Sequence, residues 1–323
     1  MGQRRIGQLG FVDAAVSRRR GIGRRDVLGE ISRLLDWSAF ERLLAVIPVA
    51  AKGEPSFPAL MMFKVMLLQR WYGLSDPAME AALFDRLSFV RFAGLSLEDA
   101  TPDHSTIWRF RERLTKDGLI ERLFAELERQ LDGRGLLIKQ GTLIDASMVT
   151  SAARRPRKED GPTSETDPDA RFGSDNERQR YTFGYKLHIA VDRGSGLIRN
   201  GLLTSANIQD ISVATALIPA DAGTVYADRG YHSKGLREHL QAHGFGDGVM
   251  RRGQKGKPLS TQELERNHFL VPLRSPVEAV FGTLKRSYGF TRMRYFKGAR
   301  NLAAYLLACM AFNLKRSLVL TTR

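Results

Sequence analysis

Three carboxylates stand at points where regular structure is predicted to end or begin. Asp145 ends the aliphatic run 136–144, and Asp228 ends the short apolar run 224–227. In open sheets with helices on their faces, sites form beyond the carboxyl ends of strands, so both aspartates are placed for chemistry. Each also has a simpler interpretation, because aspartate commonly caps turns through its own side chain. The third carboxylate is Glu278, at the start of a predicted helix.

The segment around Glu278 carries both signs of charge on one face. Its apolar positions 277, 280, 281 and 284 have the spacing of an amphipathic helix. At about 100° per residue, Arg274, Glu278 and Lys285 fall within about 40° of one another, with Arg274 just outside the helix. Ser275 and Glu278 also match a capping box, with Pro276 at the first helical position. A helix cap would explain why a glutamate is at position 278, but it would not explain why Arg274 and Lys285 lie on the same helix face.

Two aspartates and a glutamate brought together need a divalent cation, because carboxylates a few ångström apart repel one another. Mg²⁺ prefers such hard oxygen ligands and keeps waters and phosphate oxygens in its shell. Two ions about 3.5–4 Å apart can activate an attacking oxygen and stabilise the leaving one in phosphodiester displacement. Arg274 and Lys285 would hold phosphates nearby. The pattern therefore favours phosphodiester chemistry over small-molecule chemistry.

Other kinds of site are less well supported. His239 and His243 have a zinc-like spacing but no evident third ligand, so a surface pair is expected. Cys309, the only cysteine, lies in an apolar stretch, which excludes disulfide scaffolds and suits a reducing cytosol. No glycine-rich phosphate loop is present, so a nucleotide cofactor is not expected. The longest apolar run, 302–312, is shorter than the roughly 18 residues of a membrane span.

Charge indicates a polyanionic partner. The 323 residues include 50 Lys and Arg against 35 Asp and Glu, a net charge of +15. No acidic residue occurs in 279–323, and a second basic cluster comprises Arg18–Arg20 with Arg24 and Arg25. Each phosphate that a basic residue neutralises releases counterions, so nucleic acid is the favoured partner, with a solvated basic surface as the alternative.

The length predicts two domains, divided near residue 135. Residues 1–135 are predicted to be helical, with helices at 60–71, 78–84, 105–114 and 119–131. The third carries Arg109, Arg111 and Arg113 opposite an apolar side. This pattern is compatible with a helix-turn-helix in which Arg109 and Arg113 contact DNA, although many helical bundles share it.

The spacing of apolar residues changes after residue 136, from a helical period to the alternation of strands. Residues 185–192 alternate between apolar and polar, a glycine-rich turn follows, and 197–204 is the returning strand. Helices are predicted at 211–218 and 233–243, and strands at 224–227 and 245–250. This order predicts an α/β domain over 136–323, with a mixed sheet flanked by helices and basic C-terminal helices. The polar stretch 151–180, with Arg154, Arg155, Arg157 and Lys158 at its start, is predicted to be a mobile basic loop.

In combination and order, six motifs resemble the DDE-type insertion-sequence transposases of the insertion sequence 5 group, within the insertion sequence 4-like superfamily. The motifs are Thr101–Thr106, Leu143–Ser147, Asp167–Ala170, Phe183–His188, Tyr226–Tyr231 and Arg274–Lys285. The resemblance implies an RNase H-like fold behind a helical DNA-binding domain. It also implies that Asp145, Asp228 and Glu278 are the catalytic metal-binding triad, with the second aspartate on the fourth strand.

The wider group has a Tyr, Arg, Glu, Lys signature around its last acid. Arg274, Glu278 and Lys285 keep the expected gaps of three and six residues, but Val271 occupies the tyrosine position. Only 49 residues separate Asp228 from Glu278, too few for the large inserted β-domain of some relatives.

The predicted function is metal-dependent cleavage at the terminal inverted repeats of a mobile element, followed by transfer of the 3′-hydroxyl into target DNA. Mg²⁺ is the expected cofactor, two ions in number, and Mn²⁺ can substitute. Double-stranded DNA is the partner, bound by Arg274, Lys285, Arg109, Arg113, Arg154 and Arg155. Because both ends must be cut together, we expect a homodimer, acting in the bacterial cytosol at the nucleoid.

Two other interpretations stay open. The chain is alternatively a catalytically inactive or domesticated DNA-binding protein derived from a transposase. The second alternative is an RNase H-like nuclease without strand transfer.

Overall fold

The computed structural model describes residues 2–8, 10, 13, 25–49, 54–157, 159, 161–175 and 180–322. The chain forms two compact units, one of Met1–Gln130 with Leu306–Arg323 and one of Leu131–Tyr305. Of the basic residues singled out in the sequence, Arg18–Arg20, Arg24 and Lys158 lie outside the described residues.

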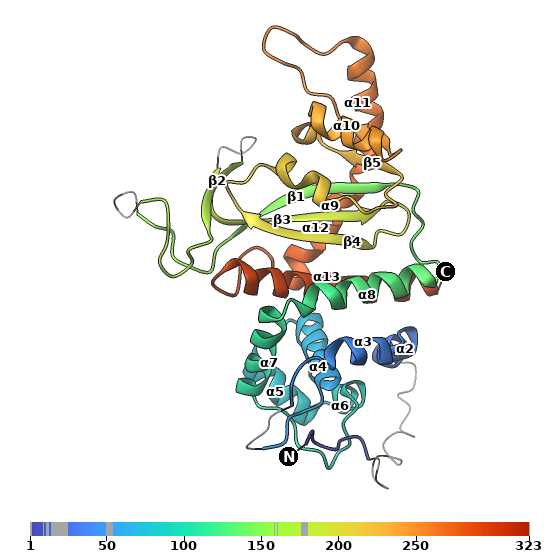
Figure 1. The fold of residues 1–323 in the computed structure, drawn as a ribbon, viewed down its shortest axis with the longest axis vertical. Helices are drawn as coiled ribbons and strands as arrows, with labels where there is room; N and C mark the ends of the chain where they lie inside the picture. Colours follow the sequence, from blue (N-terminus) through green and yellow to red (C-terminus); the bar gives the residue numbers. More distant parts are fainter. Residues whose placement is uncertain are drawn as a thin grey trace. The chain divides into compact units, whose positions relative to one another are not determined.

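The named elements of the first unit are helices (Figure 1). They are α2 (Val27–Leu34), α3 (Trp37–Leu44), α4 (Ala59–Tyr72), α5 (Asp76–Asp85), α6 (Leu87–Ala93), α7 (His104–Lys116) and α8 (Leu119–Gly133), whose last residues extend past the division. Each helix predicted between 60 and 131 is present, with ends that differ by at most two residues. Ser75 caps α5 through Ala78 N, and Asp103 caps α7 through Thr106 N at 2.6 Å. The Thr101–Thr106 motif therefore starts a helix.

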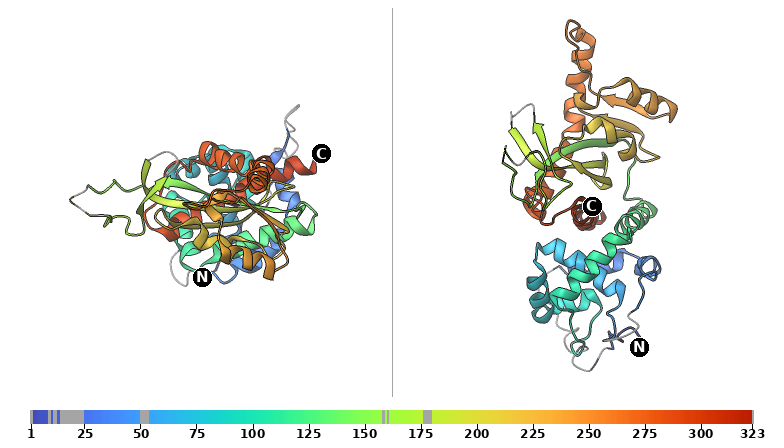
Figure 2. Two further views of the ribbon diagram at one scale, coloured as in Figure 1. Left: turned by 90° about the horizontal axis from the view of Figure 1, so that it is seen from above. Right: turned by 60° about the vertical axis from the view of Figure 1, so that its left-hand side comes forward.

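The second unit is a mixed α/β structure. Its elements are β1 (Thr142–Thr150), β2 (Arg171–Asp175), β3 (Arg180–Asp192), β4 (Ile198–Ser205), η2 (Asp210–Val213), α9 (Ala214–Leu217), β5 (Thr224–Ala227), η3 (Arg229–Tyr231), α10 (Lys234–Ala242), β6 (Gly246–Val249), α11 (Thr261–Arg274), α12 (Pro276–Tyr288) and the start of α13 (Gly298–Thr321). The predicted hairpin at 185–204 and the strand at 224–227 are confirmed. In both figures the described residues between β1 and β2 extend away from the sheet (Figures 1 and 2).

The sheet is mixed, in the order β2-β3-β1-β5-β6, with β4 also paired to β3. The strands β1, β2 and β4 are antiparallel to β3, whereas β1 with β5 and β5 with β6 are parallel. This mixed sheet flanked by helices is consistent with an RNase H-like fold, as predicted.

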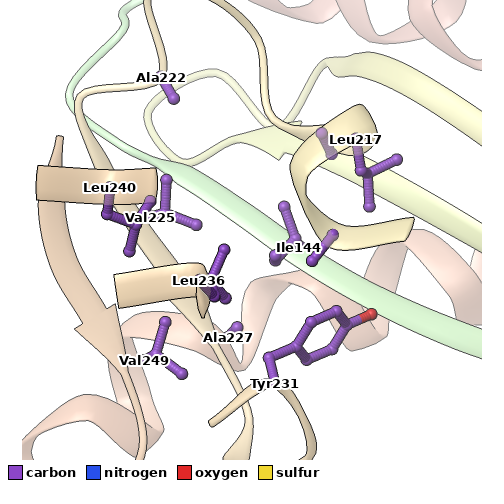
Figure 3. Packing of buried hydrophobic residues seen from close by; sticks show 11 residues of the cluster. Ile144, Leu217, Ala222, Val225, Ala227, Tyr231, Leu236, Leu240 and Val249 are labelled. Carbon is purple, nitrogen blue, oxygen red and sulfur yellow. The ribbon is translucent and has the colours of Figure 1, made fainter. Parts of the chain in front are cut away.

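Helices cover the sheet through apolar side chains that alternate along the strands. Ile144 of β1 and Val225 of β5 are fully buried against Leu217 of α9 and Leu240 of α10 (Figure 3). Because successive side chains of a strand point to opposite faces, Asp145 lies on the other face from Ile144. Helix α12 packs against β1, and α11 packs against β5.

Three details differ from the sequence expectations. Asp145 does not end its strand but is the fourth residue of β1, which continues to Thr150 because its whole length pairs with β3. The stretch 151–180 is not one loop, since it contains β2, which pairs with the first half of β3. Asp228 consequently follows the fifth strand and not the fourth.

Among the residues that the structure describes, one helix meets the length and hydropathy criteria for crossing a membrane. This is α13, and 72% of its most apolar window is buried inside the protein. Such burial is typical of a core helix.

Candidate active site

Asp145 and Asp228 lie at the same level on neighbouring parallel strands. In the register of β1 and β5, Thr142 is opposite Val225 and Leu143 is opposite Tyr226. The same register, continued by two residues, places Asp145 opposite Asp228. Since β5 ends at Ala227 while β1 runs on, the two carboxylates meet where the parallel pair separates. Asp228 thus follows the end of a strand, as predicted, whereas Asp145 lies inside its strand.

Asp145 is a half-buried carboxylate with charges of both signs nearby. Its side chain is 17% exposed, and Ala146 N donates a 2.8 Å hydrogen bond to Oδ1. Burial, and to a smaller extent the charges of Asp228 and Asp210, raise the pKa of Asp145 to about 6, against the opposing effect of the Arg274 guanidinium. A cation placed here would stabilise the ionised carboxylate.

Asp228 is held at the start of η3. Its Oδ1 accepts a 2.8 Å hydrogen bond from Gly230 N, so the aspartate does cap a turn. A Cβ atom at Gly230 would lie 3.0 Å from that same oxygen, which explains the glycine in this motif. Only one of the two carboxylate oxygens is used in this bond. Capping and chemistry are thus compatible at Asp228.

Arg274 joins Asp145 to Glu278. Its Nη2 lies 3.3 Å from Asp145 Oδ2, and its Nη1 lies 3.6 Å from Glu278 Oε1. The guanidinium is 18% exposed, whereas the Glu278 side chain is 66% exposed. Arg274 is the last residue of α11, just outside α12, as its predicted position required.

The expected capping box at Ser275 is absent, so the prediction of a cap at Glu278 was wrong. Ser275 has helical dihedral angles, φ −53° and ψ −28°, and makes no side-chain cap. A capping side chain needs an extended N-cap residue, which this close junction of α11 and α12 does not provide. The Ser275 hydroxyl instead donates to Pro272 O at 3.2 Å. Glu278 is therefore left for the interaction with Arg274.

The carboxylates suit a hard divalent cation in part. Asp145 and Asp228 supply oxygen donors on adjacent strands, and burial, the main cause of the raised pKa of Asp145, disfavours its ionised form unless a cation lies nearby. Yet no three His, Cys, Asp or Glu side chains in the described ranges are grouped closely enough to hold an ion. Glu278 faces the arginine in this arrangement. For Glu278 to join the two aspartates at an ion, its carboxylate must turn away from Arg274.

The predicted DNA-binding residues are distributed over both units. On α7, Arg109 is exposed and Arg113 pairs with Asp117 at 2.8 Å. In the second unit Arg154 and Arg155 are exposed, and Lys285 is half-buried on α12. The Arg155 guanidinium carbon lies 5.1 Å from the centre of a phenylalanine ring. That ring and the arginine line a hollow of about 720 Å³, whose walls are Arg155, Pro156, Arg157, Gly161, Pro162 and Phe172.

One residue of the predicted basic helix face is buried. Arg111 is 1% exposed, and its Nη2 donates to Gln69 Oε1 at 2.9 Å. Its Nη1 donates to Asp76 Oδ2, also at 2.9 Å. Arg111 therefore joins α7 to α4 and α5, and only Arg109 and Arg113 of the three arginines face solvent.

Sequence reasoning did not single out Asp210, whose charge contributes to the raised pKa of Asp145, or Tyr231. Asp210 begins η2, and Tyr231 ends η3, two elements that pack together. Asp210 follows a predicted strand and precedes a predicted helix, so its place at an element end was a usable signal. Tyr231 gave no signal beyond its nearness to Asp228 in the sequence.

Comparison with known protein families assigns the chain to a family. The transposase DDE domain family matches residues 136–314, and a transposase domain family (DUF772) matches residues 16–113. The first match covers more than half of the 323 residues, so the chain belongs to the DDE transposase family. No solved structure matches the chain.

The chain is thus a DDE transposase, an enzyme that cleaves DNA and transfers the cut strand in a divalent-metal-dependent reaction. The resemblance to insertion-sequence transposases is confirmed. The insertion sequence 5 group stays a prediction.

Proposed function

We propose that Asp145, Asp228 and Glu278 hold the catalytic metal, two Mg²⁺ ions for which Mn²⁺ can substitute. The register that sets Asp145 opposite Asp228, together with Arg274 between Asp145 and Glu278, supports this proposal. When bound, the ions supply Lewis acidity at the phosphodiester and lower the pKa of an attacking water.

Arg274 has two roles in this proposal. Without metal it compensates the charges of Asp145 and Glu278, which it contacts at 3.3 and 3.6 Å. Once those carboxylates engage a cation, the guanidinium is available for a DNA phosphate, which it can bind through two parallel hydrogen bonds. Lys285, seven residues beyond Glu278 on α12, would hold a second phosphate.

The reaction proceeds in two displacements. In the first, water attacks the phosphorus at an end of the element, the bond to the 3′ oxygen breaks, and a 3′-hydroxyl is released. In the second, that hydroxyl attacks a phosphodiester of target DNA and displaces its 3′ oxygen. No protein nucleophile takes part, so the phosphorus is never bound to a side chain.

DNA binding rests on the basic residues of both units. We assign Arg109 and Arg113 of the helical unit to the terminal inverted repeats, and Arg154 and Arg155 of the β1–β2 segment to the DNA near the site. The +15 net charge supports a polyanionic partner. Cutting both ends together calls for a homodimer, acting in the bacterial cytosol at the nucleoid.

Joining of a pre-cut DNA end tests this function. A duplex that carries an inverted repeat of the element with a free 3′-hydroxyl is incubated with plasmid and Mg²⁺, using wild type and Asp228→Asn. Joined product from wild type alone supports the transposase. Nicking without joining would favour an RNase H-like nuclease, and DNA binding with neither reaction would favour an inactive relative.

A further inference from the structure

A basic turn at residues 252–257 leaves the sheet at the edge where Asp228 lies. Strands β5 and β6 are parallel and pair over their whole lengths, so the segments that follow them, with Asp228 and the turn, leave the same edge of the sheet. Backbone hydrogen bonds of 3.0 Å in both directions between Gln254 and Lys257 close the turn. In Figure 1 the chain between β6 and α11 extends beyond the strands (Figure 1).

Hydrogen bonds hold the base of the turn on two sides. Asn267 of α11 bonds both backbone groups of Arg251, because Arg251 N donates to Oδ1 at 2.7 Å and Nδ2 donates to Arg251 O at 2.9 Å. Arg252 N donates to His232 Nδ1 at 3.1 Å. His232 directly follows η3, the turn that Asp228 caps. The base of the basic turn is therefore fixed to α11 and to the segment that carries Asp228.

The charges of the turn are not used within the protein. Arg252, Lys255 and Lys257 are exposed, and among the described residues none of their side chains has a hydrogen bond or an ion pair. Arg251, at the base, differs from them, because it is half-buried and pairs with Asp247 at 2.7 Å. The unpaired positive charge is thus concentrated beyond the anchored base.

An anchored turn with unpaired basic side chains suits a phosphate backbone. Each phosphate that a basic side chain neutralises releases a counterion, and contacts of this kind position DNA without reading its sequence. A basic loop that moves freely must be ordered when DNA binds, and the lost conformational entropy opposes binding. Because the base of this turn is already fixed, its basic side chains can meet phosphates with less of that loss.

We propose that the basic turn binds phosphates of the duplex DNA that enters the site, a few base pairs from the bond that is cut. This inference rests on the proposed function, because it assumes that the bond is cut beside Asp145 and Asp228. Helix α11 connects the turn to the site, since it begins shortly after the turn and ends at Arg274, which contacts Asp145. Its 14 residues span about 20 Å, the length of about six base pairs.

The salt dependence of DNA binding tests the charge of the turn. The probe is a duplex that carries an inverted repeat of the element and its flanking DNA. The double variant Lys255→Gln/Lys257→Gln should reduce the slope of log affinity against log salt by about 2. A double variant with the wild-type slope would show that the turn is a solvated surface and would overturn the proposal.

Arg134→Gln is the matched control. Arg134 is also exposed and has no side-chain hydrogen bond or ion pair among the described residues. It lies before the start of β1, and because β1 and β5 are parallel, this is the opposite edge of the sheet from Asp228. The slope for Arg134→Gln should equal that of wild type.

Cleavage of DNA from the turn itself tests its position. Cys309, the only cysteine, is completely buried, so Lys255→Cys can be labelled at position 255 alone with an iron–EDTA reagent. On a duplex with a free 3′-hydroxyl end of the element, ascorbate and peroxide should then cut the DNA within about six base pairs of that end. Labelled Arg134→Cys should give no cuts there.

The same duplex separates this proposal from the proposed function. No cuts near the end by labelled Lys255→Cys, while wild type joins the duplex to plasmid in Mg²⁺, would overturn the role of the turn and leave the proposed function intact. Cuts near the end, with neither joining nor nicking by wild type, would support the turn as a DNA contact and contradict the proposed function.

Discussion

Replacing Asp167 with asparagine is expected to destabilise the second unit strongly, although the two side chains have the same size. Asp167 is completely buried. Its carboxylate accepts hydrogen bonds from Ser151 Oγ at 2.5 Å, from the Tyr185 hydroxyl and from Lys297 N at 2.8 Å. These donors follow β1, lie in β3 and precede α13, respectively. One carboxylate therefore joins three segments that are far apart in the sequence.

The magnitude follows from this count of donors. Asparagine keeps one acceptor oxygen, which Tyr185 and Lys297 can share, but turns an amide towards Ser151. The Ser151 hydroxyl then loses its acceptor, and two charged hydrogen bonds become neutral ones. A hydrogen bond to a charged group contributes about 1.5–3 kcal/mol and a neutral one about 1 kcal/mol, so losing one charged bond and weakening two others gives an expected loss of at least about 2.5 kcal/mol. Asp167→Ala, which leaves all three donors unpaired, should cost more.

Urea unfolding followed by far-ultraviolet circular dichroism measures this loss. Tryptophan fluorescence does not suit it, because all three tryptophans, Trp37, Trp71 and Trp108, belong to the first unit. Asp169→Ala is the control, since Asp169 is exposed and accepts only from Gly298 N at 2.8 Å among its described side-chain bonds. That variant should cost about 1 kcal/mol or less. An Asp167→Asn protein as stable as the control would refute the reasoning.

Three further predictions concern the first unit and DNA binding. Asp76→Ala leaves the buried Arg111 guanidinium without its carboxylate partner, so it should lower the free energy of unfolding of the first unit by about 3 kcal/mol, measured by tryptophan fluorescence. Asp117→Ala, which removes a surface ion pair, should change that free energy by less than about 0.5 kcal/mol. Although burial raises the pKa of Asp76, hydrogen bonds from Arg111 and Gln69 bring it below its ordinary value, so the ionised form stabilises the fold. This stabilisation should be complete above about pH 5 and be lost as the pH falls below about 4. The stability of Asp76→Ala should therefore depend less steeply on pH below about pH 5 than that of wild type, and an equal pH dependence would contradict this prediction. Arg155→Gln should reduce the slope of log affinity for DNA against log salt by about 1, while Arg129→Gln, at an exposed intrahelical pair, should leave the slope unchanged.

Much of the second unit could be predicted because alternation and turn residues are local signals. The hairpin at 185–204 and the strand at 224–227 follow directly from side-chain period. The length of β1 could not be read in this way. Its second half, from Asp145 to Thr150, is extended because it pairs with β3, and that pairing is set by residues more than thirty positions away.

The site shows the same division between local and tertiary signals. Asp228 was placed correctly at the end of a strand because strand ends are local features, whereas Asp145 lies inside β1. The capping-box pattern at Ser275 misled, since the close junction of α11 and α12 decides the backbone of that residue. Arg111 was assigned to a basic helix face, yet its partner Asp76 lies on another helix. The packing of η2, which begins at Asp210, on η3, which follows Asp228, has no local signal in the sequence.

Nicking of supercoiled plasmid tests the central claim most directly. Wild type and Asp228→Asn are compared at low salt in Mg²⁺, in Mn²⁺ and with EDTA, after DNA binding by both proteins has been confirmed. We predict that wild type relaxes the plasmid in either metal, and that EDTA and Asp228→Asn each abolish the reaction. Relaxation by Asp228→Asn at the wild-type rate, or by wild type in EDTA, would contradict the assignment of Asp228 to a metal-dependent site.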